Sequence, residues 1–232
     1  MRPITLASAL CLVGLLSVPG AVWAQSTTPA KGPGAGLLPP TIPIFPLPDV
    51  MLFPNVSRPL HIFEPRYRAM VADALKGDRI IGMVLLRPGY EADYEGRPAV
   101  YPIGCAGVIT DVEELPDGRF NIVLRGLAKF RVTGEDQSRA YRLARVEAMP
   151  ELLKDEERVA LRKQRQRLEA LLVAPGSEPP PPTIPDDELV NALAQYLDLD
   201  PMDRQELLER DGALSRSQAL IDLLDLKVTP PR

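Results

Sequence analysis

Histidine and cysteine are scarce in this 232-residue chain, which has one histidine, His61, and two cysteines, Cys11 and Cys105. Structural zinc sites take four Cys or His ligands, so a zinc site with Cys and His ligands alone cannot be built within one chain. Positive charge is not in excess either, because 27 Lys and Arg residues stand against 31 Asp and Glu residues and the net charge is −4. A bulk field that attracts nucleic acid is therefore absent, and we expect no metal, cofactor or nucleic-acid partner.

Long apolar runs are missing beyond the first residues of the chain. Residues 4–18 carry no charge, follow Arg2, and lead to small residues before a cleavage point after Ala24. This layout is typical of a signal peptide over residues 1–24 and predicts an exported protein, periplasmic or secreted, with no membrane span after cleavage. The alternative is an uncleaved N-terminal anchor, because the segment is just long enough to span a bilayer. Cleavage leaves Cys105, whose apolar neighbours predict burial.

The sequence that follows carries strand patterns interrupted by proline. Apolar residues at helical spacing from Tyr67 to Leu75 predict one early helix that begins at Pro65. The Leu-Pro-Asp-Gly sequence at 115–118 is typical of a type I turn, so its flanking segments predict a hairpin. Residues 41–150 are therefore expected to form a β-rich, barrel-like unit.

The last third of the chain carries helical patterns. Residues 25–40 precede the β-rich unit and are expected to form a flexible Pro/Gly leader, whereas residues 151–226 predict a helical subdomain. A proline-rich segment at 175–185 interrupts the helices and reads as an insertion. Ser215 and Gln218 have the spacing of a capping box, which predicts that the last helix begins at Ser215.

The sequence Pro-Leu-His-Ile-Phe-Glu-Pro-Arg-Tyr at 59–67 resembles the N-terminal substrate-binding domain of Lon proteases, and Ile-Gly-Cys-Ala at 103–106 and Leu-Arg-Gly at 124–126 match further on. The resemblance covers about residues 41–226. It implies an α+β fold, a PUA-like β pseudo-barrel with one early helix, followed by a C-terminal helical bundle. The motif residues are expected to be structural: Pro59, Leu60, His61, Ile62, Phe63, Glu64, Arg66, Tyr67, Gly104 and Gly126.

The resemblance does not extend to the catalytic parts of a Lon protease. The chain has no G-x-x-x-x-G-K-S/T sequence for binding ATP, and no segment resembles the family's Ser/Lys protease domain. The resemblance therefore implies a stand-alone, non-catalytic module that binds unfolded polypeptide or a specific protein partner, such as a separate protease, in the cell envelope. A self-associating scaffold or adaptor, forming a homo-oligomer, is the alternative.

Binding of unfolded polypeptide needs an exposed apolar surface with adaptable side chains. Met51, Phe53, Met83, Tyr90 and Tyr94 are the candidates for this surface, with the two tyrosines placed in a polar loop. A place in the hydrophobic core is the alternative for Phe53 and Met83.

A hydrolase is a further, less favoured alternative. Ser57, His61 and Glu64 lie within eight residues and have the side chains of a nucleophile, a base and an orienting acid. Glu64 directly precedes the early helix, however, and His61 is expected to be a packed residue beside that helix start. We therefore expect no catalytic site here.

Overall fold

The computed structural model describes residues 38–89, 96–136, 138–172 and 180–228. The predicted signal peptide, Tyr90, Tyr94 and most of the predicted leader lie outside these residues. No helix within the described ranges is long and apolar enough to cross a membrane.

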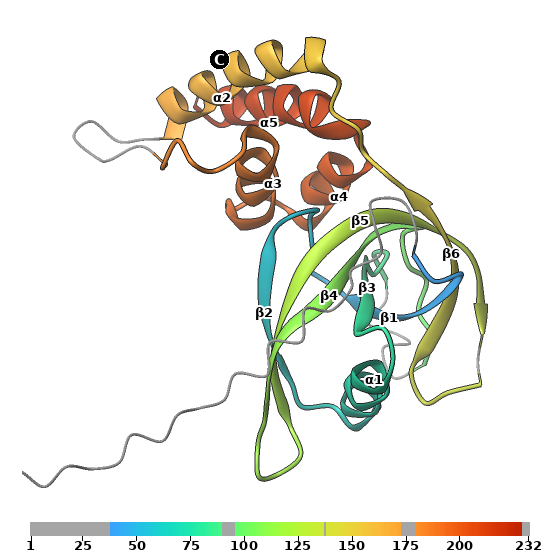
Figure 1. The fold of residues 1–232 in the computed structure, drawn as a ribbon. Helices are drawn as coiled ribbons and strands as arrows, with labels where there is room; N and C mark the ends of the chain where they lie inside the picture. Colours follow the sequence, from blue (N-terminus) through green and yellow to red (C-terminus); the bar gives the residue numbers. More distant parts are fainter. Residues whose placement is uncertain (1–37, 90–95, 137, 173–179, 229–232) are drawn as a thin grey trace, which may run out of the picture.

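The structure is a mixed α+β fold with a six-stranded sheet and five helices among the described residues (Figure 1). The strands are β1 (Thr41–Leu47), β2 (Ser57–Ile62), β3 (Ile80–Leu85), β4 (Ile103–Glu114), β5 (Phe120–Asp136) and β6 (Arg142–Met149). The helices are α1 (Pro65–Lys76), α2 (Asp155–Leu172), α3 (Asp186–Tyr196), α4 (Pro201–Glu209) and α5 (Gly212–Val228). Figure 1 shows α2–α5 gathered on one side of the sheet, with α1 on the opposite side.

The strand pairings close on themselves. The sheet order is β2-β5-β4-β3-β1-β6, and β6 also pairs with β5, so five strands form a ring and β2 adds to β5 outside it. Among the described strands, β1 and β3 pair in parallel and the other pairings are antiparallel. The predicted hairpin is confirmed: β4 and β5 are joined by the turn at 115–118, where Gly118 has φ of 79° and its N–H donates to the Leu115 carbonyl at 2.9 Å.

Small residues let the ring close around one aromatic side chain. Phe130 is fully buried in a cluster to which every strand of the ring contributes, so the cluster fills the ring's interior. A Cβ added at Gly82 would lie 2.7 Å from the Phe130 ring, and one added at Gly104 would lie 2.3 Å from the Met83 carbonyl oxygen. These separations are below van der Waals contact, so both positions require glycine.

The two prolines of β1, Pro43 and Pro46, are tolerated within the sheet because each pairs with a single neighbouring strand. Residues 41–44 of β1 pair with β6 and residues 44–47 pair with β3. Pro43 and Pro46 fall in different halves, so each faces a single strand partner and its missing N–H need not remove a ladder bond.

A larger core joins the sheet to the helices. It includes Phe53, which precedes β2, Met70 of α1, Leu161 of α2 and Leu220 of α5, all fully buried. The β-rich part and the helices therefore share one hydrophobic core.

Two helix starts differ from the sequence prediction. The last helix, α5, begins at Gly212 with φ of 81°, three residues before the predicted capping residue Ser215. The helical subdomain predicted from residue 151 has its first helix, α2, beginning at Asp155; Glu151 precedes that helix, and its carboxylate binds buried cations.

Candidate functional site

The residues of the hydrolase alternative do not form a triad. Ser57 and His61 lie on one strand four residues apart, which separates them by roughly 13 Å. The His61 ring contacts other residues: Nδ1 lies 2.7 Å from Asn121 Oδ1 and Nε2 lies 3.2 Å from a nitrogen of Arg119. Glu64 pairs with Arg66 at 2.9 Å. Within the described part of the chain, no three Cys, His, Asp or Glu side chains gather as metal ligands.

His61 is exposed, which corrects the expectation that it packs beside the start of α1. On β2 the residues Pro59 and His61 lie on the exposed face, whereas Ile62 points into the core. The alternation of side chains along a strand sets this outcome, and the neighbouring helix does not cover the exposed face. Phe63 is exposed as well, while Tyr67 is buried against Phe45.

A buried cation joins the helices to the β-rich part. The guanidinium of Arg216 is fully buried and donates to Glu151 Oε1 at 2.5 Å, to Asn191 Oδ1 at 2.5 Å and to the Leu207 carbonyl at 2.9 Å. Asn191 in turn donates to the Pro54 carbonyl at 2.9 Å. These contacts tie α3, α4 and α5 to the segments that flank the sheet.

A second buried cation meets the same carboxylate. Lys129 of β5 lies with its ammonium 2.7 Å from Glu151 and 2.6 Å from the Arg210 carbonyl oxygen. Burial alone would raise the pKa of Glu151, but the ion pairs with Arg216 and Lys129 outweigh it and hold this pKa below its usual value. One carboxylate thus serves two buried cations, whose remaining hydrogen bonds go to Asn191 and to backbone carbonyl oxygens, so this cluster holds the fold together.

Two adjoining cavities open beside this junction. One, of about 360 Å³, lies between the sheet and the helices, and the other, of about 630 Å³, runs along α2. Leu153 and Asp187 line both, so the cavities meet there. We call the second cavity the α2 groove; its lining includes Leu153, Arg158, Val159, Arg162, Lys163 and Asp186.

Exposed apolar side chains border these cavities. Leu152, which lines the first, is 80% exposed, and Val159, which lines the α2 groove, is 66% exposed. Around them, Arg158 pairs with Asp155 at 3.1 Å and Arg162 pairs with Asp186 at 3.3 Å. The result is an open apolar surface bordered by paired charges.

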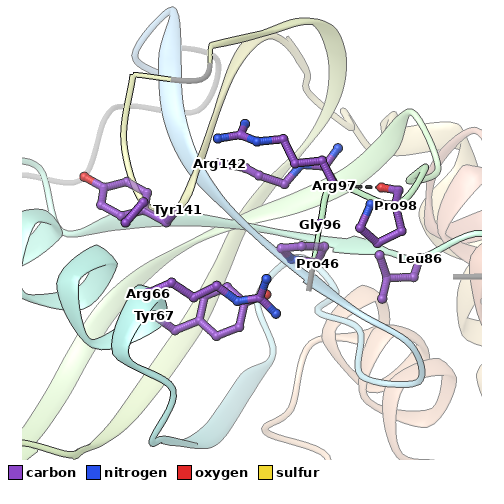
Figure 2. A pocket seen from close by; sticks show the side chains of 10 residues that line it. Pro46, Arg66, Tyr67, Leu86, Gly96, Arg97, Pro98, Tyr141 and Arg142 are labelled. Carbon is purple, nitrogen blue, oxygen red and sulfur yellow. Dashed lines mark hydrogen bonds between the residues drawn. The ribbon is translucent and has the colours of Figure 1, made fainter. Parts of the chain in front are cut away.

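A third cavity, of about 210 Å³, lies on another part of the β-rich unit (Figure 2). Arg66 and Tyr67 reach it from α1, Pro46 lies on β1, and Arg142 lies on β6. We call it the arginine pocket, because the described residues that line it include the three arginines Arg66, Arg97 and Arg142.

The structure removes three of the five predicted binding residues from the surface. Met51, Phe53 and Met83 are buried in the core, which is the alternative that the sequence left open for Phe53 and Met83. The reason is tertiary: α3 lies over the Phe53 segment, where the Phe53 N–H donates to Gln195 Oε1 at 3.0 Å. Tyr90 and Tyr94 lie outside the described residues, so their assignment stays a prediction.

The sequence analysis did not identify Leu152 and Val159 as surface residues, although the sequence contains a signal for both. Leu161 and Leu168 form the buried face of α2, and Val159 falls off that face within a charged segment. Leu152 stands in a short apolar pair between Glu151 and Lys154. An apolar residue outside the buried stripe of a charged helix indicates a surface patch.

Close backbone contacts surround two of the motif glycines, Gly104 and Gly126. A Cβ at Gly126 would lie 2.0 Å from the Phe53 carbonyl oxygen, since the segment before β2 crosses β5 there. Asn55 donates to the Gly126 carbonyl, and Gly126 donates to the Val56 carbonyl. Only glycine allows the two backbones to approach this closely.

Comparisons with known proteins agree with this fold. The chain is 25% identical to the Lon protease of Cytophaga hutchinsonii over 81% of its length and 26% identical to that of Anaeromyxobacter dehalogenans over 90%. It spans about a quarter of the length of these relatives, 24% and 26% respectively.

Two solved structures share the architecture. The Lon N-terminal domain protein from Xanthomonas campestris superposes with a TM-score of 0.55 at 25% identity, covering 78% of this chain and 97% of that one. The N-terminal domain of Mycobacterium avium complex Lon protease superposes with a TM-score of 0.58 at 17% identity, covering 80% of this chain and 98% of that one. The model of the ATP-dependent protease La (LON) substrate-binding domain matches residues 41–225, and the chain therefore belongs to that family.

Proposed function

We propose that this chain is a substrate-recognition module that binds unfolded polypeptide and catalyses no reaction itself. The observation that carries the proposal is the family match over residues 41–225, together with the exposed apolar surface beside α2. The family is described by substrate binding, and the relatives named above are proteases that act on polypeptide chains.

The α2 groove supplies the physical basis for binding. Unfolded chains expose apolar side chains, and covering apolar area releases roughly 25 cal/mol per Å². Leu152 and Val159 are largely exposed in this structure, so a bound chain would gain from covering them. The groove is open and within the roughly 300–1,000 Å³ range of ligand sites, which suits an extended segment.

Fluorescence anisotropy tests the proposal directly. The purified chain from Gln25 would be titrated against labelled α-lactalbumin in its native form and in its reduced and alkylated, unfolded form. We expect selective binding of the unfolded form that ATP does not change. Equal binding of both forms, or binding of neither, would contradict unfolded-chain recognition.

Surface variants locate the binding face. Leu152→Ser combined with Val159→Ser is expected to weaken binding about thirtyfold, since it removes two exposed apolar contacts of roughly 1 kcal/mol each. Leu226→Ser is the matched control, because Leu226 is 67% exposed and does not line these cavities. An equal loss in the control would move binding away from the α2 groove.

Export and the absence of catalysis are separate parts of the proposal. The signal-like segment at residues 1–24 supports a place in the cell envelope, and fractionation with N-terminal sequencing tests it: Gln25 is the expected first residue.

Incubation with casein tests catalysis, and degradation without an added protease would contradict that part. Self-association of a chain that binds no polypeptide, seen by sedimentation, would favour the scaffold alternative.

A further inference from the structure

The exposed side of β2 continues across β5 onto β4 as one surface. The register of the three strands places their outward side chains in two cross-strand rows. We call this surface the outer face; its residues are Pro59, His61, Asp111, Glu113, Asn121 and Val123. They line an open cavity of about 410 Å³, which is within the roughly 300–1,000 Å³ range of ligand sites.

The β2 end of the outer face is apolar and aromatic. Phe63, two residues after His61, is 60% exposed, and its ring stacks on the His61 ring with 6.1 Å between the ring centroids. Pro59 is exposed as well, and Val123 is half-buried beside it. Apolar side chains that are exposed beside a cavity are typical of an interaction site.

The β4 end of the outer face is negatively charged. Glu113 accepts a hydrogen bond from the Asn121 side-chain amide at 2.7 Å, and Asp111 accepts one from the Val112 N–H at 2.9 Å. Both donors are neutral groups, so these hydrogen bonds orient the two carboxylates without neutralising them. Both acids are exposed, so a ligand can reach them.

Two arginines border the outer face, and each is paired with another acid. Arg119 lies 3.2 Å from His61 Nε2 and pairs with Asp117 at 2.7 Å. Arg125 pairs with Glu188 of α3 at 3.5 Å. A carboxylate pair beside apolar side chains repels phosphate groups, which disfavours nucleic acid and anionic lipid as ligands. The complementary ligand is a polypeptide that carries a cation and an apolar side chain.

The strand spacing matches an extended polypeptide. Neighbouring strands lie about 4.8 Å apart, so β2 and β4 are separated by roughly 10 Å across β5. In an extended chain, side chains two residues apart lie on one side, about 7 Å from each other. The flexible stem of lysine covers the remaining distance, and its methylene groups pack on apolar surface such as Val123.

We propose that the outer face binds an extended polypeptide segment that carries an apolar side chain and, two residues away, a lysine or arginine. The apolar side chain packs on Phe63 and His61, and the cation pairs with Asp111 and Glu113. This inference rests on the proposed function, and it names a class of sequence in the unfolded substrate that a second site, apart from the α2 groove, recognises.

Three fluorescent peptides test the inference. They share a glycine-serine sequence and differ at its centre, which is Leu-Ser-Lys, Leu-Ser-Glu or Gly-Ser-Lys. We expect the chain from Gln25 to bind the Leu-Ser-Lys peptide at least about tenfold more tightly than either of the others at low salt, because the glutamate is repelled and the glycine covers no apolar surface. Equal affinity for the three peptides, or binding of none, overturns the inference.

Variants of two neighbouring acids locate the cation. Glu113→Gln removes the charge but keeps an oxygen for Asn121, and we expect it to weaken binding of the Leu-Ser-Lys peptide about threefold. Glu114→Gln is the matched control, because Glu114 is also exposed, follows Glu113 on β4, and does not line the cavity. Equal weakening in both variants would assign the preference to the net charge of the chain and overturn the inference.

A third variant tests the apolar end. Phe63→Ser is expected to lower the affinity for the Leu-Ser-Lys peptide to that for the Gly-Ser-Lys peptide, whose own affinity stays unchanged. Leu226→Ser, which replaces a similarly exposed residue outside the cavity, should change neither. Weaker binding of both peptides by Phe63→Ser would assign Phe63 a structural role and overturn the apolar part of the inference.

The two proposals fail differently. Loss of unfolded-protein binding in the Leu152→Ser, Val159→Ser variant with an intact preference for the Leu-Ser-Lys peptide supports both sites. A chain that binds unfolded protein but treats the three peptides alike retains the proposed function and loses this inference. A chain that distinguishes the peptides but binds no unfolded protein retains the outer face as a peptide site and loses the proposed function.

Discussion

The carboxylate of Glu151 accepts hydrogen bonds from both terminal nitrogens of the fully buried Arg216 guanidinium, at 2.5 and 3.2 Å. This relationship joins the segment before α2 to α5, and Lys129 adds β5 to it. A buried charge that loses its partner is far more costly than the intact pair is favourable.

Replacing Glu151 is therefore expected to destabilise the fold strongly. Glu151→Ala leaves Arg216 and Lys129 buried without a counter-charge, which predicts a loss of about 3–5 kcal/mol in the free energy of unfolding. Urea unfolding followed by circular dichroism measures the change. Glu114→Ala, at an exposed position, is the control and should stay within about 0.5 kcal/mol of wild type. A similar small change in Glu151→Ala would show that the cluster does not stabilise the fold.

The same carboxylate gives stability a pH dependence. The folded-state pKa of Glu151 is lowered, so the unfolded chain binds its proton at a higher pH than the folded chain does. The stabilisation is fully present above the unfolded pKa of about 4.3 and is lost as pH falls through the folded value. We expect Glu151→Gln to reduce the fall in unfolding free energy measured between roughly pH 5 and pH 3. This range covers the unfolded pKa and the lower pH values at which the stabilisation is lost. An unchanged slope would contradict the assignment.

Contacts inside the strand ring predict which of two glycine substitutions, Gly104→Ala or Gly82→Ala, destabilises the fold more. Gly104→Ala places its Cβ against the Met83 backbone, which cannot move aside, whereas Gly82→Ala meets the Phe130 and Ile42 side chains. Overpacking costs about 1–3 kcal/mol, and we expect Gly104→Ala to be the more destabilising by thermal unfolding. Phe130→Leu should partly rescue Gly82→Ala and leave Gly104→Ala unrescued. Equal rescue of both would show that the ring adjusts as a whole.

Cys105 is expected to be inert in the folded chain. Burial raises the pKa of its thiol far above the usual value, so the reactive thiolate is not formed near neutral pH. With the chain from Gln25, which lacks Cys11, Ellman's reagent at pH 8 should report no free thiol until urea is added and one afterwards. Rapid reaction without urea would indicate that β4 opens locally.

Features fixed by neighbouring residues could be predicted from the sequence. The β4–β5 hairpin follows from the four residues 115–118, and the burial of Cys105 follows from its apolar neighbours. Contacts between distant segments could not be predicted. Phe53 and Met51 seemed available for binding because the α3 residues that cover their segment lie about 140 residues later, as the Phe53–Gln195 hydrogen bond shows.

The candidate sites were missed for the same reason. Arg66 and Arg142 come from α1 and β6, and the sequence gives no sign that the closed ring of strands brings them to one pocket. The α2 groove depends on where Asp186, at the start of α3, lies beside Arg162. Both sites are products of the tertiary fold.

The position of Pro59 has a consequence for aggregation. Among the described strands β2 has one neighbour, β5, and its other side is an open edge. The Ser57 carbonyl oxygen faces that edge and accepts hydrogen bonds from Gln195 and Tyr196, so by alternation Pro59 faces it too, without an N–H to offer. Pro59 therefore interrupts this edge as a template for an unfolded chain held nearby, because an added strand would find one ladder hydrogen bond missing there.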